Sequence, residues 1–185
     1  MRIIIIGGVL LTFIMLISQT AIEKSQTTYQ DLKKEAERYF ESGSYALAHS
    51  LYTKINKKEL SSTQARWVDF RQADTLWRSE AATNSADTTK LDQARQQLEM
   101  LIRDIQRVED RDRVWVEVQE SLGDFWWSRR NSRNWSQAWI YYQAALDWWA
   151  GSSDLDLART RYLKIVWTLS KPPEVEPYYY YGYYG

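Results

Sequence analysis

Few side chains in this chain have the chemistry that catalysis or metal binding requires. His49 is the only histidine among the 185 residues, and cysteine is absent. Nucleophilic catalysis and structural metal sites need several such groups at one place, so a single imidazole completes neither. We expect His49, which follows the packing residue Ala48, to face solvent or to lie at a rim of the fold. No catalytic residue, metal ligand or cofactor is therefore predicted.

Carboxylates are plentiful, but their spacing indicates no active site. One charge cluster spans Glu109–Arg113, and a second acidic pair is Asp154 and Asp156. We expect both at connections or helix starts, where acidic side chains favour the positive end of the helix dipole. Neither has the twelve-residue pattern of a calcium loop, and no G-x-S-x-G, P-loop or G-x-G-x-x-G motif occurs. A hydrolase with an unfamiliar site is thus the last of three hypotheses, after two kinds of binding protein.

The charge balance argues against nucleic acid as a partner. Lys+Arg and Asp+Glu both number 24, so the formal net charge is zero. A long-range attraction to nucleic acid or to an anionic membrane surface is not expected from such a chain. The absence of cysteine also excludes disulfides, thiolate metal sites and lipoprotein acylation. The expected partner is a protein or a peptide.

The N-terminal segment, residues 1–25, bears on the compartment. One arginine precedes an apolar or small stretch from Ile3 to Ile17, and Glu23 carries the next charge. Fifteen residues at about 1.5 Å each are short for a membrane span of about 30 Å, but suit a secretion signal. Ala21 could precede a cleavage site, although Gln19 is a poor fit there. We expect a signal peptide or an N-terminal anchor, and an exported protein that is periplasmic or anchored at the inner membrane. The alternative is a buried helix of a cytosolic protein.

Residues 26–170 have the periodicity of helices throughout, which predicts an all-α domain. Three prolines and seven glycines in the whole chain leave room for long helices with short polar connections. Gly43 is expected to end the first helix and Asn134 to cap the sixth. Apolar residues three and four apart predict seven helices, at about 29–43, 45–55, 62–81, 91–108, 114–129, 135–149 and 154–170.

Six of the ten tryptophans lie between Ser121 and Trp149. In the sixth helix, one apolar face runs through Trp135, Ala138, Trp139, Tyr142, Ala145, Leu146 and Trp149, and an adjacent one through Tyr141, Ala144 and Trp148. A helix that is apolar on two faces is packed on two sides, as in stacked helical hairpins. Most of these rings are therefore expected in the core, each with a partner for its indole N–H.

Three predicted hairpins share a pattern of small and aromatic residues. In the first hairpin, Leu32, Ala36 and Tyr39 of the first helix are followed by Ala48 and Tyr52 of the second. In the third hairpin, Leu122, Gly123 and Trp126 are followed by Ala138, Tyr142 and Ala145. The second hairpin matches more loosely, with Ala73 and Trp77 followed by Ala94, Leu98 and Leu101. Over about residues 29–150 this pattern resembles the tetratricopeptide repeat. The resemblance implies a short solenoid of helical hairpins, with Ala36, Ala48, Ala94, Gly123 and Ala138 at the helix crossings. The second and third loops are longer than in that family, and Leu60 and Ala150 stand where a proline is usual.

The resemblance also implies a binding surface. In tetratricopeptide arrays, the first helix of each pair lines a groove that holds a segment of a protein partner. The corresponding positions here are Lys33, Glu37, Phe40, Asp74, Arg78, Asp124 and Trp127. The alternative is that these are ordinary surface residues, with Lys33 and Glu37 forming an i,i+4 pair.

A narrower resemblance concerns the C-terminal half. The string "VQESLGDFWWSRRNSRNWSQAWIYYQAALDWWAGS", with the later "LARTRYLKIVW" and "PYYYYGYYG", resembles a helical segment of large exported bacterial alpha-2-macroglobulin-like proteins. Their working parts lie further along the chain, and a thioester trap needs a cysteine that is absent here. The resemblance implies an accessory segment, either free-standing or at the front of a longer protein.

Residues 171–185 form a Pro/Tyr-rich tail with no helical pattern. Six tyrosines and two glycines fill its last eight positions. The tail either is disordered or packs on the open end of the solenoid as a cap, and we expect partial packing. Tyrosine and tryptophan faces also stack on sugars, so a carbohydrate or cell-wall binding module is the second hypothesis. Asn134-Trp135-Ser136 matches a glycosylation sequon, but a helix start explains it better.

Overall fold

The computed structural model describes residues 29–83, 87–128 and 133–170, and within these ranges it is all-helical with no strand, as predicted. The predicted N-terminal segment 1–25 and tail 171–185 lie outside the described residues. None of the described helices is long and apolar enough to cross a membrane. The helices are a stretch over 29–41, α2 (Tyr45–Tyr52), α3 (Ser62–Thr83), α4 (Thr89–Ile102), α5 (Arg113–Ser128), α6 (Trp135–Ala150) and α7 (Leu155–Ser170), with 3₁₀ turns at Lys57–Glu59 and Val108–Asp110.

Local sequence signals set several helix ends. Gly43 has a φ of 76°, and the Gly43 and Ser44 amides donate to the Phe40 and Tyr39 carbonyls, which is the Schellman arrangement at a helix end. Before α6, the side chain of Asn134 accepts from the Gln137 amide. The two predictions for Gly43 and Asn134 are confirmed.

Helix α4 is shorter than its apolar pattern predicted. The pattern continues to Val108, but the helix ends at Ile102, and Val108 is exposed in a 3₁₀ turn. Arg66 of α3 donates to the Leu101 carbonyl at the end of α4 and pairs with Asp112 before α5. A partner from another helix thus satisfies a carbonyl that a longer helix would have bonded internally.

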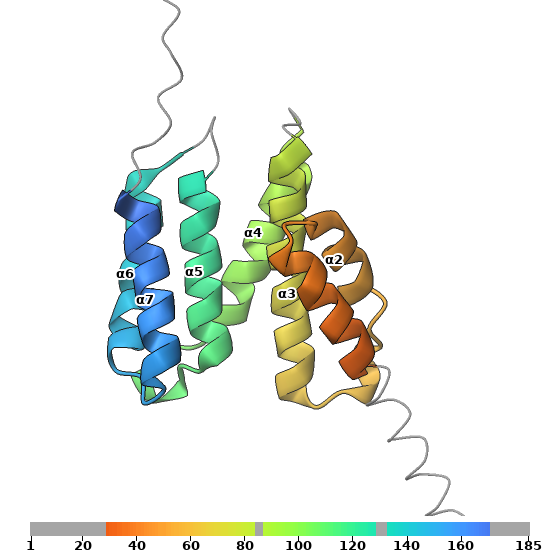
Figure 1. The fold of residues 1–185 in the computed structure, drawn as a ribbon, viewed down its shortest axis with the longest axis horizontal. Helices are drawn as coiled ribbons and strands as arrows, with labels where there is room; N and C mark the ends of the chain where they lie inside the picture. Colours follow the sequence, from red (N-terminus) through yellow and green to blue (C-terminus); the bar gives the residue numbers. More distant parts are fainter. Residues whose placement is uncertain (1–28, 84–86, 129–132, 171–185) are drawn as a thin grey trace, which may run out of the picture.

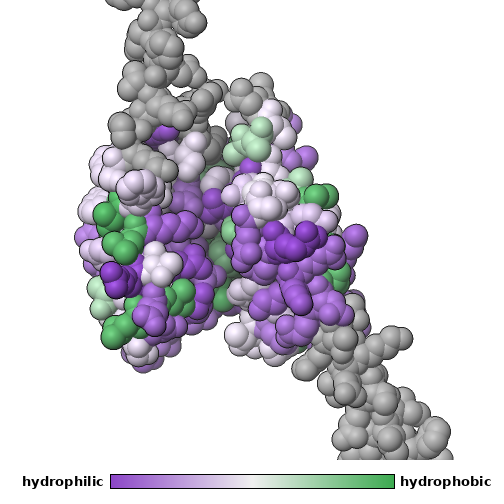
Figure 2. All heavy atoms as spheres, viewed as in Figure 1, coloured by the Kyte–Doolittle hydropathy of each residue, from purple (hydrophilic) through white to green (hydrophobic). Residues whose placement is uncertain are grey.

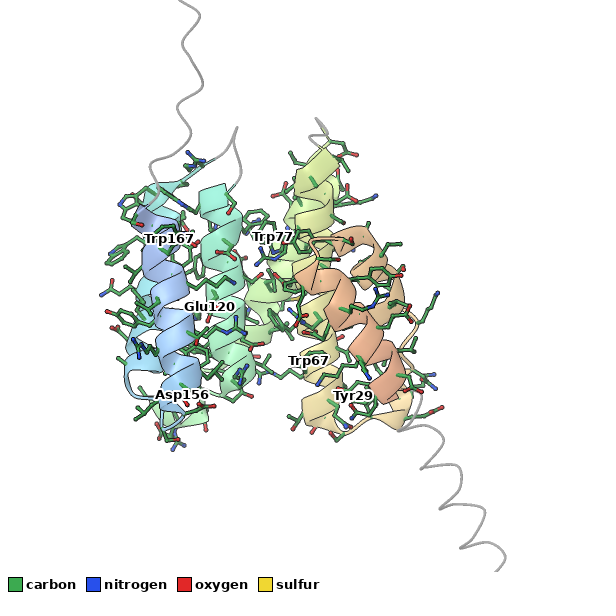
Figure 3. All side chains as sticks on the ribbon, viewed as in Figure 1. Tyr29, Trp67, Trp77, Glu120, Asp156 and Trp167 are labelled. Atoms are coloured by element: carbon green, nitrogen blue, oxygen red, sulfur yellow. The ribbon has the colours of Figure 1, made fainter. Side chains whose placement is uncertain are left out.

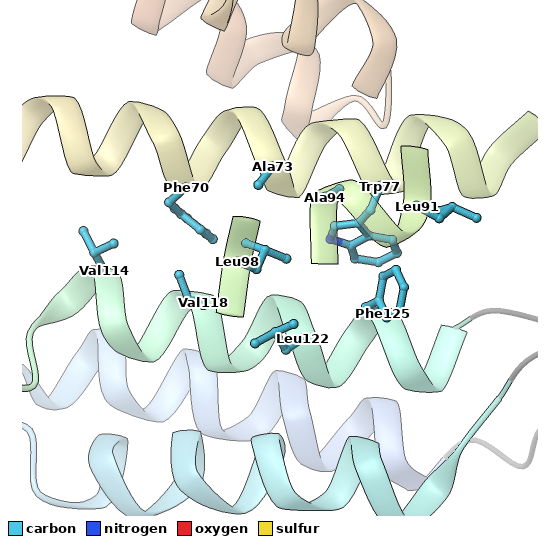
Figure 4. Close-up of a cluster of buried hydrophobic side chains, with 10 residues drawn as sticks. All are labelled: Phe70, Ala73, Trp77, Leu91, Ala94, Leu98, Val114, Val118, Leu122 and Phe125. Atoms are coloured by element: carbon cyan, nitrogen blue, oxygen red, sulfur yellow. The ribbon is translucent and has the colours of Figure 1, made fainter. Parts of the chain in front are cut away.

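The buried residues form three successive clusters along the chain. The first joins helix 29–41 and α2 to the start of α3, the second joins α3, α4 and α5, and the third joins α5, α6 and α7. Figure 1 shows the same order in space, with α4 between α3 and α5. Figure 4 shows the second cluster, to which α3 gives Phe70 and Trp77, and α5 gives Leu122 and Phe125. The order of packing follows the order of the chain.

Small residues lie at the predicted helix crossings. Ala36, Ala48, Ala94 and Ala138 are fully buried. At Gly123, an added Cβ would lie 2.6 Å from the Tyr142 ring, which leaves no room for any other residue without a shift of α6. The prediction of a close helix approach is confirmed at Gly123, and the four alanines are buried as a crossing position requires.

The prediction for the first apolar face of the sixth helix is correct for most of its residues and wrong for Trp135 and Trp139. Trp149 is 1% exposed, and its indole donates to Glu120. Trp135 and Trp139 are 47% and 39% exposed, with their rings stacked at a centroid distance of 5.7 Å. At about 100° per residue, Trp139 lies roughly 60–100° round the helix from Ala138, Tyr142 and Trp149. That angle takes its ring beyond the face that α5 and α7 cover.

Candidate functional site

A polar pocket lies where four helices converge. Its volume is about 200 Å³. Figure 2 shows this face of the molecule, with hydrophilic side chains on both sides of the hollow. The lining residues are Glu37, Phe40 and Glu41 from helix 29–41, Phe70, Arg71, Asp74 and Arg78 from α3, Glu117, Glu120, Ser121 and Asp124 from α5, and Arg161 and Lys164 from α7. Five of the seven groove residues predicted from the sequence are among the lining residues, namely Glu37, Phe40, Asp74, Arg78 and Asp124.

A line of alternating charges crosses from helix 29–41 through α3 to α5. Arg71, Asp74 and Arg78 are spaced by three and four residues, so they lie on one face of α3. Arg71 donates three hydrogen bonds to Glu37, one from Nε at 2.9 Å and two from Nη2 at 2.6 Å. Arg78 donates to Asp74 at 2.8 Å. Arg78 also donates to Asp124 of α5 at 2.7 Å. We call these five residues the charge ladder.

Buried hydroxyl and indole groups complete the charge ladder. Tyr142 of α6 donates to Asp124 at 2.7 Å, and Tyr52 of α2 donates to Glu37. Ser121 of α5 donates to Asp74 at 2.6 Å and accepts from the Trp77 indole. The charge ladder is thereby linked to α2 through Tyr52 and to α6 through Tyr142.

Asp74 occupies the centre of the ladder and is only 1% exposed. Burial alone would raise the pKa of its carboxyl, but Arg78, Arg71 and the Ser121 hydroxyl outweigh burial and lower the pKa below its ordinary value. Asp74 is therefore charged at neutral pH, and its oxygens are held by three side chains. Its position identifies a structural part in holding α3 against α5.

A second group of charges joins α5 to α7. Arg161 of α7 donates to Glu117 at 2.9 Å and to Glu120 at 3.1 Å. Glu120, labelled in Figure 3, also accepts from the Trp149 indole at 2.6 Å. Burial raises the pKa of Glu120 above its ordinary value, against the lowering effect of Arg161. This group faces the charge ladder across the pocket.

Two predicted site residues lie elsewhere. Lys33 stands over the Trp67 ring at 4.1 Å. Trp127 is half-buried, donates its indole N–H to the Thr168 carbonyl of α7 and contacts the Trp135 ring. Neither lines the pocket. The predicted Lys33–Glu37 pair is also replaced, because Glu37 binds Arg71 and Tyr52 instead.

His49 is half-buried, which fits the predicted position at a rim of the fold better than the predicted solvent-facing one. Its Nδ1 atom lies 3.1 Å from the Gln72 carbonyl and 3.2 Å from the Thr75 hydroxyl of α3. Burial lowers the pKa of His49 below its ordinary value, despite the bond to Gln72. His49 directly follows the buried Ala48, and its two bonds to α3 place it at the contact between α2 and α3. Its contacts indicate a structural part.

Sequence reasoning missed Arg71, Glu120 and Arg161, together with Glu117 and the rim residues Glu41 and Lys164. A signal was present for the first two: Arg71 continues the series of Asp74 and Arg78, and Glu120 lies between Glu117 and Asp124 at the same spacing. Charged residues repeated three and four apart next to an apolar face indicate a shared, partly covered surface. Arg161 carries no comparable signal, because its two carboxylate partners lie more than forty residues earlier in the chain.

Most charged groups of the pocket are engaged with one another. Among the residues that the structure describes, no group of three or more His, Asp or Glu side chains is arranged to hold a metal ion. The ladder carboxylates are engaged by guanidinium groups. At the rim, Glu41 and Lys164 are exposed, and neither forms an ion pair with another described residue. Comparisons of the chain with protein-family models, curated proteins and solved structures found no match.

Proposed function

We propose that this chain is a non-catalytic helical scaffold that binds an extended segment of a protein partner in the pocket. The observation that carries the proposal is the convergence of Glu37, Phe40, Asp74, Arg78 and Asp124, predicted as groove residues, on one hollow. The helix stretch 29–41, α3, α5 and α7 supply every lining residue. These are the first helices of successive hairpins, as the proposed tetratricopeptide-like solenoid requires.

The charges divide the pocket into a fixed part and an available part. The ladder residues are engaged with one another, so a ligand that displaced them would leave buried charges unpaired at high cost. Glu41 and Lys164 are exposed at the rim, on helix 29–41 and on α7. We propose that they pair with opposite charges on the bound peptide, while the ladder keeps the pocket in shape.

A peptide selection with charge-reversed variants tests this proposal. Peptides would be selected from a random library on the full chain, and their Kd values measured by fluorescence polarisation. Glu41→Lys and Lys164→Glu, combined, should weaken the selected peptides by about ten-fold or more, because attraction at two contacts becomes repulsion. Both side chains are exposed, so circular dichroism should show unchanged helicity.

The matched control reverses two exposed charges that do not line the pocket, Lys54→Glu and Glu35→Lys. The control should leave the Kd values unchanged. Selected peptides that bind the rim-reversed variant as tightly as the unchanged chain would contradict peptide binding at this pocket.

The exposed rings of α6 favour carbohydrate binding as a second candidate function. Trp135 and Trp139 are exposed and stacked, with an interplanar angle of 23°, and Trp127 contacts Trp135 edge-on. A titration of soluble glycan and cell-wall fragments against tryptophan fluorescence, with Trp139→Ala as the comparison, tests it. A flat response at millimolar ligand would exclude this candidate.

The proposed partner lies outside the cytoplasm. Support comes from the sequence of residues 1–25 and from the resemblance of the C-terminal half to a segment of alpha-2-macroglobulin-like proteins. Under this proposal, the bound segment belongs either to a separate exported protein or to a longer chain that contains the scaffold. Fractionation of the epitope-tagged full chain from a bacterium with two membranes tests the compartment, and recovery in the cytoplasm would contradict it.

A further inference from the structure

The charges that line the pocket do not balance. Six carboxylates and four cationic groups face the hollow. Arg113, which lies outside the pocket, adds one more cation through its pair with Glu117. The carboxylates still outnumber the cations by one, and protein walls of low dielectric constant strengthen the field of an unbalanced charge. The pocket is therefore a better environment for a cation than for an anion.

The charges are also sorted by side. Helix 29–41 gives the pocket Glu37, Phe40 and Glu41, and no cation. On the other side, α7 gives only Arg161 and Lys164, and Figure 1 shows the two helices on opposite sides of α3 and α5. Glu37 and Glu41 are four residues apart on one helix, where like charges repel each other. The acidic side of the pocket is thus the side of helix 29–41.

The two rim charges differ in how far the protein already compensates them. Glu41 is exposed and forms no ion pair with another described residue. Arg38, one turn before it, pairs with Glu35 instead. Lys164 lies close enough to Glu120 to lower the pKa of that carboxyl, against the effect of burial. An anion bound at Lys164 must therefore compete with Glu120, whereas a cation bound at Glu41 meets no such competitor among the described residues.

The neighbouring carboxylate is also short of positive charge. Glu37 accepts three hydrogen bonds from Arg71, but Arg71 also pairs with Asp74. Within the charge ladder as a whole, three carboxylates share two guanidinium groups. A further cation beside helix 29–41 would restore the balance and would displace no existing pair.

A basic side chain fits this position better than a bare ion. Phe40 is half-buried and lines the pocket between the two glutamates of its helix, so the apolar stem of a lysine or arginine can pack on its ring. The charged end of that side chain can then form charge-assisted hydrogen bonds with carboxylate oxygens. We propose that the pocket selects a basic segment of the partner, with a lysine or arginine side chain bound beside Glu37 and Glu41. This assignment rests on the proposed peptide binding.

Peptides that are weakened by the combined Glu41→Lys and Lys164→Glu changes supply the probe. They would be synthesised with acetylated and amidated ends, so that only side chains carry charge. One set has every lysine and arginine replaced by glutamine, and a second set has every acidic residue replaced by its amide. On the full chain, loss of the basic residues should raise the Kd about ten-fold or more. Loss of the acidic residues should raise it about two-fold or less, because Glu120 already attracts Lys164.

The Glu41→Gln variant locates the bound cation. In this variant, loss of the basic residues from the peptide should raise the Kd only about three-fold or less, because their partner carboxylate is gone. Asp104→Asn removes the same charge from an exposed position outside the pocket and is the matched control. It should keep the full ten-fold difference. Both altered side chains are exposed, so circular dichroism should show unchanged helicity in both variants.

The outcomes separate the two proposals. Equal losses for the basic and the acidic replacements would overturn the selection of a basic segment and leave the proposed peptide binding standing. A ten-fold difference that persists in Glu41→Gln would do the same, because the cation would then bind elsewhere. A selection that yields no peptide weakened by the charge-reversed variant would overturn both proposals.

Discussion

Helix α5 is held on its two sides by different kinds of contact. Toward α6, Gly123 lies directly against the Tyr142 ring, so a missing side chain sets the approach. Toward α3, Ser121 and Asp124 join a line of buried or half-buried charges that runs through Asp74 and Arg78. At Gly123 the approach depends on shape. At the charge ladder it depends on the pairing of polar groups, beside the apolar contact of Trp77 with Phe125.

The difference matters for the pocket. The contact between α5 and α6 lies mainly inside the third cluster, and it reaches the pocket only where Tyr142 and Trp149 donate to Asp124 and Glu120. The contact between α3 and α5 forms the pocket floor, because Asp74, Arg78 and Asp124 all line it. A fully paired polar network is more directional than apolar packing. The charge ladder therefore fixes the part of the fold on which the proposed binding surface depends.

The largest effect is expected from removing the centre of the ladder. Asp74→Ala leaves Arg71 and Arg78 each short of one carboxylate in a buried setting. The free energy of unfolding should fall by about 3 kcal/mol. Asp69→Ala is the control on the same helix, because its pair with Lys57 is exposed and should contribute about 1 kcal/mol or less. Urea unfolding measures both, and equal losses would show that the ladder is no stronger than a surface ion pair.

A smaller loss is expected at the shape-dependent contact. Gly123→Ala places a Cβ 2.6 Å from a fully buried ring, and the required shift should cost about 1–3 kcal/mol. Gly151→Ala is the matched control: its nearest neighbour would be the Trp148 carbonyl at 3.7 Å, and its φ is −94°. That variant should be neutral or slightly more stable. A Gly123→Ala protein as stable as the unchanged chain would contradict the claim that shape sets the contact between α5 and α6.

Acid should weaken the ladder side selectively. The pKa of Asp74 is lowered by folding, so its contribution to stability is complete above the ordinary value of 3.8 and is lost as the pH falls below it. The pKa of Glu120 is raised by folding, so the folded state favours its protonated form. The contribution of Glu120 to stability is therefore present at low pH and is lost as the pH rises, which is the opposite of Asp74. The stability difference between the unchanged chain and Asp74→Asn should therefore shrink from neutral pH toward about pH 3. A constant difference in urea unfolding would contradict this assignment.

The smallest effect is expected at the start of α6. Asn134→Ala removes the bond from the Gln137 amide and should cost about 1 kcal/mol. Ser136→Ala is a suitable control, since Ser136 is exposed in the same turn and both changes remove the glycosylation sequon. A loss confined to Asn134→Ala, measured by thermal unfolding, would assign the effect to the cap. Equal losses in both variants would contradict that assignment.

The apolar contacts could be predicted from the sequence because their signals are local. Ala138, Tyr142 and Trp149 repeat at helical spacing, and Gly123 interrupts a strongly apolar helix. The same periodicity overestimated α4, because Arg66, a residue 35 positions away from Leu101, bonds the end of that helix. Periodicity also placed Trp135 and Trp139 inside, because it does not show how wide a face the neighbouring helices cover.

The pocket could be predicted only in part. The spacing of Asp74 and Arg78 placed them on one face, but pairing with Asp124, 46 residues further on, depends on how α3 and α5 cross. Trp127 stands beside Trp126 in the sequence, yet it contacts α7 instead of the pocket. Long-range pairing of charges has no sequence period, so the ladder became visible only in the folded chain.

A double-mutant cycle on Arg78 and Asp124 tests most directly whether the charge ladder fixes α3 against α5. Arg78→Gln, Asp124→Asn and the combined variant would be compared with the unchanged chain by urea unfolding, since these two groups meet at 2.7 Å across the two helices. A coupling of about 1 kcal/mol or more is the predicted result. A coupling near zero would contradict the claim that charge pairing shapes the pocket.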